Sequence, residues 1–236
     1  MRRFAYCILA LLMTAGTLVA SAQSEDTRNV SGYIGVESSG PFDVHIKIDG
    51  TESLKIVAKP EAIAKIETKV EDGKLKIYLK DHWNWKWNGK SLNYGKIDIY
   101  VNAKSLTEVS NGGSGVMAID GVISGSSVDV SMSGSGSITG VVKADEFHSS
   151  ISGSGTINLT GTADKADLNI SGSGSFHSKE LQTNTANIRI AGSGNVHLTA
   201  EKTISAHIAG SGEIFYSGNA KEGDIKVFGS GDIRKE

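Results

Sequence analysis

The segment LNISGSGSF, residues 168–176, shows the pattern that decides the fold. Apolar side chains alternate with polar ones on both sides of a central Gly-Ser-Gly tripeptide. Alternation with a period of two is typical of a strand with one buried face. The segment therefore predicts two strands joined by a corner, and glycine suits the corner because it accepts positive φ angles and close backbone approach.

The same tripeptide occurs seven times in the second half of the chain, at nearly constant spacing. Successive copies begin 21, 19, 19, 20, 18 and 19 residues apart. A fixed period near 20 residues is the signature of a solenoid, in which each repeat forms one coil. The first glycines of the copies are Gly113, Gly134, Gly153, Gly172, Gly192, Gly210 and Gly229.

Three columns of side chains around the corner are apolar in every coil, apart from Ser149. The positions between these columns are mostly polar, so we expect the three columns to point into the core. Two residues before the first glycine stand Met132, Ile151, Ile170, Ile190, Ile208 and Val227. Four before it stand Val130, Ser149, Leu168, Ile188, Ala206 and Ile225, and four after it Met117, Ile138, Ile157, Phe176, Val196, Ile214 and Ile233.

An all-β solenoid with coils of about 19 residues is thus the predicted fold. The alternative is a β-sandwich or meander in which each Gly-Ser-Gly closes an antiparallel hairpin, since a three-residue hairpin loop with glycine fits locally. A steady repeat with like residues in register favours coils over hairpins.

The first half of the chain is less periodic but is also predicted to be mainly β. Pro60, followed by Ile63, Ile66 and Val70 at helical spacing, predicts one short helix with proline at its start. Glu71-Asp72-Gly73 predicts a turn. Strands are predicted from the alternation in Phe42–Ile48, Leu75–Leu79 and Ile97–Val101.

The N-terminus has the features of a signal peptide. Arg2 and Arg3 precede an apolar run that is too short to span a membrane, and Ala20-Ser21-Ala22 is a cleavage signal. We therefore expect an exported protein. The predicted segments are 1–22 as signal peptide, 23–29 as a short linker, and 30–236 as one domain with an irregular β half, 30–105, and a repeat half, 106–236.

Composition and charge exclude several classes of protein. The only cysteine, Cys7, lies inside the signal peptide, so the exported chain has no disulfide to stabilise it. Without Arg2 and Arg3, 22 basic residues stand against 26 acidic ones, a net charge of −4. This balance argues against a nucleic-acid partner, which requires a basic surface.

The chain resembles a known family of exported bacterial proteins, the putative auto-transporter adhesins with a head GIN domain, common in Bacteroidetes. The resemblance implies a right-handed β-helix-like fold, an exported protein and a role in cell adhesion, and it supplies no catalytic residues. We expect no cofactor. It is carried by Phe42-Asp-Val44-His-Ile46 with Leu54-Lys-Ile56, by Ile66-Glu-Thr-Lys-Val70-Glu-Asp-Gly73-Lys-Leu75-Lys-Ile77, and by the Gly-Ser-Gly series.

The residues themselves contain no recognisable catalytic or metal-binding motif. The patterns G-x-S-x-G and H-E-x-x-H are absent. His177 and His197 stand at equivalent positions of adjacent coils, where two imidazoles could share a metal, but no third ligand is evident. For polysaccharide cleavage, the candidate acids and bases are Arg189, His207 and Lys226 in one column and Glu213 and Asp232 in another.

The segment HWNWKWNG, residues 82–89, is the strongest candidate for ligand binding. It places Trp83, Trp85 and Trp87 at alternate positions, and Tyr94 follows. On a strand the three indoles would line one face, where exposed rings stack well on sugars. The alternative is that these rings cover a flank or an open end of the core.

The function predicted from these features is a non-enzymatic binding or adhesion module of the bacterial cell envelope. Its partner would be a glycan or a surface protein, and its location the periplasm, the outer-membrane surface or the extracellular space. A solenoid also has ends through which copies can pair. The alternatives are a carbohydrate-active enzyme on the same scaffold and a structural envelope protein without a discrete ligand.

Overall fold

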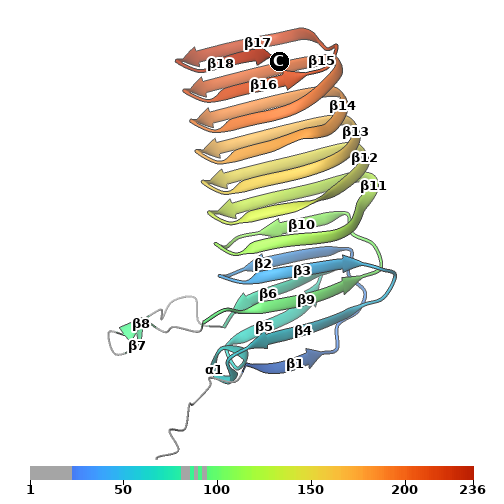
Figure 1. Ribbon diagram of the computed structural model, residues 1–236, viewed down its shortest axis with the longest axis vertical. Helices are drawn as coiled ribbons and strands as arrows, with labels where there is room; N and C mark the ends of the chain where they lie inside the picture. The colour runs from blue at the N-terminus through green and yellow to red at the C-terminus, as the bar shows by residue number, and fades with distance from the viewer. Residues whose placement is uncertain (1–22, 81–85, 88–89, 92–94) are drawn as a thin grey trace, which may run out of the picture.

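The computed structural model describes residues 23–80, 86–87, 90–91 and 95–236. They form a tall, flattened stack of β-coils (Figure 1). Each coil turns sharply at Gly-Ser-Gly along one edge, here called the corner edge, and bends smoothly along the other, the bend edge. Neighbouring coils pair in parallel, for example β12 with β13, which confirms the solenoid and excludes antiparallel hairpins at the repeats.

The long strands of the repeat half each run from one corner to the next. Their first halves form one side of the stack, called face A, and their second halves form the opposite side, face B. These long strands are β11 (Val116–Gly134), β12 (Ser137–Gly153), β13 (Thr156–Gly172), β14 (Ser175–Gly192) and β15 (Asn195–Gly210). Four shorter strands complete the repeat half: β10 (Glu108–Asn111) and β17 (Lys221–Gly229) on face B, and β16 (Glu213–Ser217) and β18 (Asp232–Lys235) on face A.

The N-terminal half extends both faces. Face A continues from β11 through β3, β9 and β4 to β1, and face B through β10, β2 and β6 to β5. The outermost pairs, β4 with β1 and β6 with β5, are antiparallel. The elements are β1 (Ser24–Arg28), β2 (Gly35–Ser39), β3 (Asp43–Ile48), β4 (Ser53–Ala58), α1 (Pro60–Ile63), β5 (Ile66–Glu71), β6 (Lys74–Leu79), β7 (Lys86–Trp87), β8 (Lys90–Ser91) and β9 (Asp98–Ala103).

The predicted strands of this half are confirmed, but the predicted helix is only four residues long. Pro60 begins α1 as expected, whereas Ile66 and Val70 belong to β5. Asp72 and Gly73 both have positive φ, 52° and 73°, and join β5 to β6 in a two-residue hairpin. The turn prediction is therefore correct. The helical spacing of Ile63, Ile66 and Val70 arose by chance, because a strand begins soon after the short helix ends.

Arg28 closes the N-terminal end of the stack. Its guanidinium donates to the carbonyl oxygen of Ile66 at 2.7 Å, to that of Ile63 at 3.2 Å, and to Thr68 Oγ1 at 3.2 Å. One side chain of β1 thus ties face A to α1 and to β5 of face B. Residues 23–29 are consequently not a linker, because Ser24–Arg28 form an edge strand paired with β4.

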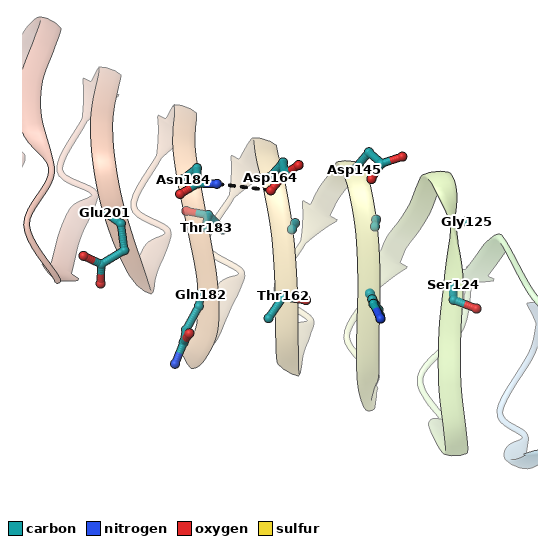
Figure 2. A pocket seen from close by; sticks show the side chains of 12 residues that line it. Ser124, Gly125, Asp145, Thr162, Asp164, Gln182, Thr183, Asn184 and Glu201 are labelled. Atoms are coloured by element: carbon teal, nitrogen blue, oxygen red, sulfur yellow. Dashed lines mark hydrogen bonds between the residues drawn. The ribbon is translucent and has the colours of Figure 1, made fainter.

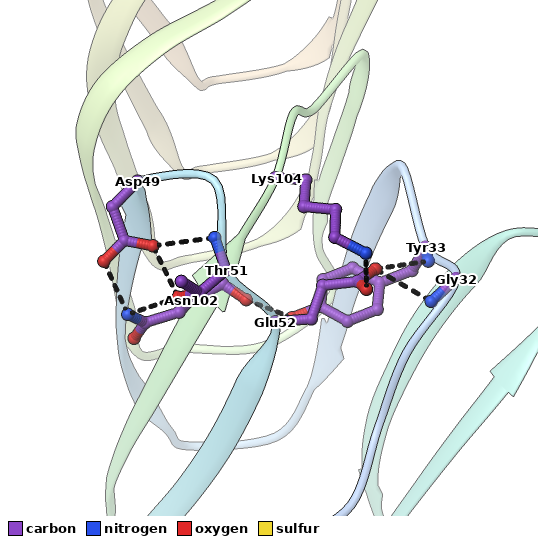
Figure 3. A network of polar contacts seen from close by, with 7 residues as sticks. All are labelled: Gly32, Tyr33, Asp49, Thr51, Glu52, Asn102 and Lys104. Carbon is purple, nitrogen blue, oxygen red and sulfur yellow. Dashed lines mark hydrogen bonds and ion pairs between the residues drawn. The ribbon is translucent and has the colours of Figure 1, made fainter.

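Loops on the bend edge of the N-terminal half are held by a polar network (Figure 3). Glu52 accepts from the backbone N–H of Gly32 at 2.8 Å and pairs with Lys104 at 2.6 Å. Burial, and then the charge of Glu52, raise the pKa of Tyr33 to about 12, and its hydroxyl donates to the carbonyl of Asn102. These contacts add side-chain links between loops that flank β2, β3, β4 and β9.

The three apolar columns do line the core. Side chains in all but the last coil are buried, and Phe147 packs near Phe176 with ring centroids 6.1 Å apart. Val227 in the last coil is 39 % exposed, whereas its counterparts in earlier coils are at most 3 % exposed. The polar exception is also buried: Ser149 Oγ forms no hydrogen bond.

The corners require glycine for both predicted reasons. Gly172 has φ +119°, a conformation that side chains rarely adopt. A Cβ on Gly174 would lie 2.4 Å from Ile151 Cγ2 and 2.8 Å from the carbonyl oxygen of Gly155. The corners therefore stack backbone on backbone, and the N–H of Ser173 donates to the carbonyl of Gly153 at 2.9 Å.

Candidate binding site

The tryptophan segment takes the place of a corner. Ser39 pairs with Tyr78 and Asp43 pairs with Asp98, so the short corner between β2 and β3 faces an insertion between β6 and β9 in the next coil. Of this insertion the structure describes only β7 and β8, which are drawn on the side of the corner edge (Figure 1). Trp83, Trp85 and Tyr94 lie outside the described residues, and Trp87 is described only as part of β7, which pairs with β8.

The bend edge of the repeat half carries an open groove of about 610 Å³. Figure 2 shows its outward side chains in two rows, with Ser124, Thr162 and Gln182 in one and Asp145, Asp164 and Asn184 in the other. We call it the bend groove. It is lined by Ser124, Gly125, Lys143, Ala144, Asp145, Thr162, Ala163, Asp164, Gln182, Thr183, Asn184 and Glu201.

Strand pairing aligns the bend groove with the axis of the stack. The first row continues from coil to coil, because Ser124 pairs with Lys143, Lys143 with Thr162, and Thr162 with Gln182. Between the two rows the chain turns inward: Ala163 is buried and its neighbours on either side are exposed. The backbone therefore forms the floor, and polar side chains form both walls.

The bend groove is acidic. Its lining includes three carboxylates, on Asp145, Asp164 and Glu201, and one ammonium group, on Lys143. Asn184 Nδ2 donates to Asp164 Oδ1 at 3.1 Å, which links two coils along the second row. Such a surface can accept hydrogen bonds from hydroxyl and ammonium groups and repels anions.

Face B carries a second open groove, of about 550 Å³, beside the corner edge. We call it the face B groove. Small side chains, Ala191 and Ala209, line its middle, and Phe228, 70 % exposed, stands at its C-terminal end. Arg189 reaches out of the same surface and forms no hydrogen bond or ion pair with the described residues. An apolar groove beside an unpaired cation is unusual on a soluble surface.

The acids and bases considered for polysaccharide cleavage are not brought together. His207 and Lys226 lie on face B, where both contact Asp224, at 2.9 and 2.8 Å. These hydrogen bonds, first from Lys226 and then from His207, hold the pKa of Asp224 below its usual range. Glu213 and Asp232 lie in β16 and β18 of face A, beside Arg234. The two columns therefore occupy opposite faces.

The two histidines noted for metal binding lie side by side with their ring planes tilted by 36°. The rings of His177 and His197 lie 5.0 Å apart, and His197 stacks on Phe215 at 4.7 Å. Burial, and then the neighbouring His177, lower the pKa of His197. Within the described ranges, no group of three or more His, Cys, Asp or Glu side chains could hold a metal ion.

Sequence analysis missed both grooves. The columns of the bend groove are hard to align, because the coils differ in length and the ladder shifts register at the bend, for example between Ile157 and Gly161. Counting backwards from each Gly-Ser-Gly would have found the face B groove, since Ser152, Ser171, Ala191 and Ala209 all directly precede a first glycine. That column is exposed, and small residues in it are what make the surface concave.

Solved structures with the same fold include three from Bacteroides and Parabacteroides species. A putative adhesin from Bacteroides fragilis has a TM-score of 0.82 and 21% identity over 92% of this chain and 98% of that one. A putative lipid binding protein from Parabacteroides distasonis has a TM-score of 0.73 and 26% identity over the same shares. A putative adhesin from Parabacteroides merdae has a TM-score of 0.68 and 21% identity, covering 92% and 97%.

No curated protein is significantly similar to the chain. In the part that the structure describes, no helix has the length and apolar character to cross a bilayer. A family model matches most of the chain, from residue 32 to residue 220. The chain belongs to the family described as putative auto-transporter adhesin, head GIN domain.

Proposed function

We propose that this chain is an exported, non-enzymatic adhesion module of the bacterial cell envelope. The observation that carries the proposal is the surface of the stack: long in-register rows of polar side chains border open grooves on a rigid scaffold. Membership of an adhesin family supports it. Many weak contacts along one rigid rod add up to firm attachment, because each later contact forms at high effective concentration.

The tryptophan segment is a second contact point in this proposal. In the chain it is inserted between β6 and β9, where the neighbouring coil has only the short connection between β2 and β3. Exposed indole rings can stack on sugar rings. Replacement of Trp85 and Trp87 by alanine is then expected to weaken ligand binding and to leave the melting temperature unchanged, whereas a lower melting temperature with unchanged binding would assign the rings to packing.

The adhesion proposal is tested with beads that carry the purified chain. They are expected to attach to surfaces coated with glycans, matrix proteins or whole bacterial cells, and free chain should compete. Beads coated with a cysteine-free globular protein of similar charge serve as the control. Failure to attach to all of these surfaces would contradict the proposal and leave a structural role in the envelope.

The enzyme alternative is separated by an activity assay on the same glycans. Glu213 lies on face A beside Arg234, with no base of the other column near it. We therefore expect no release of reducing sugar from acidic polysaccharides. Release that disappears in Glu213→Gln would establish the enzyme instead.

A second function, binding of an amphiphile, is favoured by the face B groove. The groove combines an apolar surface with Arg189, which has no ion-pair partner among the described residues, as an apolar chain with an anionic head requires. The relative from Parabacteroides distasonis is described as a putative lipid binding protein. Dodecanoate is expected to bind more tightly than dodecyltrimethylammonium, and Arg189→Gln should remove the preference. Equal binding of both amphiphiles to the unaltered chain would exclude the site.

A further inference from the structure

The bend groove has a repeat along its length. It crosses five consecutive strands, β11 to β15, from Ser124 to Glu201. Adjacent strands in a sheet lie about 4.8 Å apart. The first row is in register from Ser124 in β11 to Gln182 in β14, so it presents one outward polar side chain per step of this length over four strands. The fifth strand, β15, contributes Glu201 outside that row.

The length of the step discriminates between kinds of polymer. A ligand that lies along the groove meets equivalent side chains only if its own repeat matches the strand spacing. Residues of an extended peptide advance by about 3.3 Å and fall out of step within a few coils. One pyranose unit of a linear glycan is longer than an amino-acid residue and close to one strand spacing, and it carries hydroxyl groups on both of its edges.

The side chains of the groove suit such a chain of sugars. Thr162 and Gln182 can both donate and accept hydrogen bonds, as sugar hydroxyls do. Asp145 and Asp164, in the facing row, accept hydrogen bonds from hydroxyls and more strongly from ammonium groups. With three carboxylates against one ammonium group, the groove disfavours uronic acids, sulfated sugars and nucleic acids.

We propose that the bend groove binds a linear glycan of neutral or amino sugars, lying along the solenoid axis with one sugar unit per coil. The proposal rests on the adhesion function and names its ligand class and its site. Hydrogen bonds without aromatic stacking give weak binding for each glycan chain, and the rod gains strength when many chains are bound at once.

A length series of oligosaccharides tests the register. The probes are β-1,4-linked oligomers of glucosamine, glucose and galacturonate with two to eight units, titrated by calorimetry into the full exported chain. Affinity for the glucosamine oligomers is expected to rise at least tenfold from two to five units and to level off beyond, because the groove crosses five strands. Absence of binding to both glucosamine and glucose oligomers, or tighter binding of galacturonate, would overturn the proposal.

Variants assign the binding to this groove. Thr162→Ala with Gln182→Ala should weaken binding of glucosamine and glucose oligomers about tenfold. Asp145→Asn with Asp164→Asn should reduce the preference for glucosamine over glucose at least fivefold while the glucose oligomers still bind. All four side chains are exposed, so folding is expected to be retained and is checked by melting temperature.

Ser154→Ala with Ser173→Ala is the matched control. These exposed serines lie at the corner edge of the coils that contain Thr162 and Gln182, and their replacement should not change binding.

The bead assay separates this proposal from the adhesion function. Thr162→Ala with Gln182→Ala should reduce attachment to surfaces that display glucosamine chains. Unchanged attachment of this variant would contradict glycan binding in the bend groove but not the adhesion function. Absence of attachment by the unaltered chain would contradict the adhesion function itself.

Discussion

The two edges of the stack differ in how regularly successive coils pair. At the corner edge the glycines of successive coils are all in register: Gly134 pairs with Gly153, Gly153 with Gly172, and Gly172 with Gly192. At the bend edge the ladders shift register repeatedly, and the differences in coil length between 18 and 21 residues are absorbed there.

The contrast shows where this fold allows variation. A corner stacked backbone on backbone leaves no room for a side chain, so its sequence is fixed by sterics. The bend has outward side chains, and the ladders shift register beside it, so exposed residues there can change or increase in number while the core columns keep their places. Gly161, with φ +116°, is the exception, because a Cβ there would collide with the carbonyl oxygen of Val142. A binding surface is therefore easier to build at the bend than at a Gly-Ser-Gly corner.

Insertions should show the largest difference in stability between the two edges. One glycine inserted after Asp164 gives that coil 20 residues, the length that the next coil already has, and should cost less than about 1 kcal/mol. A serine inserted between Ser173 and Gly174 displaces the corner and should cost more than about 3 kcal/mol. Chemical denaturation of both variants measures the difference, and equal costs would show that the two edges are equivalent.

A single side chain at a corner should be the next largest effect. Gly174→Val places a branched side chain where even a Cβ would lie 2.4 Å from Ile151 Cγ2. Overpacking of this kind costs about 3 kcal/mol, or roughly 6–12 °C in melting temperature for a chain of this size. Ser173→Ala, at the exposed middle of the same corner, is the control, and a similar loss in both variants would contradict the steric argument.

Ser149→Val should stabilise the protein, because it makes the core column beside the corner apolar in every coil. The buried hydroxyl of Ser149 has no hydrogen-bond partner, whereas Val130 and Leu168 occupy the same column in adjacent coils. Removal of the unpaired group should raise the free energy of unfolding by about 1–2 kcal/mol. Ser150→Val on the exposed side of the same strand should bring no such gain.

The smallest effect concerns a carboxylate on face B. Burial alone would raise the pKa of Asp167, but hydrogen bonds from Lys165 and Asn187, each at 2.7 Å, hold it below its usual range. A lowered folded-state pKa contributes stability above the unfolded pKa of about 3.9, and this contribution is lost as the pH falls through the folded value.

Asp167→Asn should therefore lower stability at pH 7 by less than about 1 kcal/mol and make no difference at strongly acidic pH. Melting temperatures across this range test the sign. Asp145→Asn, an exposed carboxylate at the bend, should leave the melting temperature unchanged throughout. A deficit of the Asp167 variant that grows as the pH falls would refute the assignment.

The corner edge could be predicted from sequence because only glycine fits where the corners of successive coils stack. Gly174 and the column of Ile170 repeat with so little variation that alternation alone separates inside from outside. Elements whose pattern is ambiguous were misjudged. Ile63, Ile66 and Val70 fit a helix as well as a strand, and the SEDTR sequence of β1 is polar throughout, with no apolar alternation to mark it as a strand. The bend groove escaped prediction because its rows depend on how each coil curves, which side-chain pattern does not encode.

Arg28 has a consequence for how the chain folds. The end that it latches contains a short antiparallel hairpin, β5 with β6, and it is synthesised first. Every later coil can then add to an edge that already exists, so it closes one loop of about 20 residues and gains a full row of hydrogen bonds at once. We expect growth of the rod to resemble templated polymerisation, with the latched end as its seed and each Gly-Ser-Gly as the point where the next layer begins.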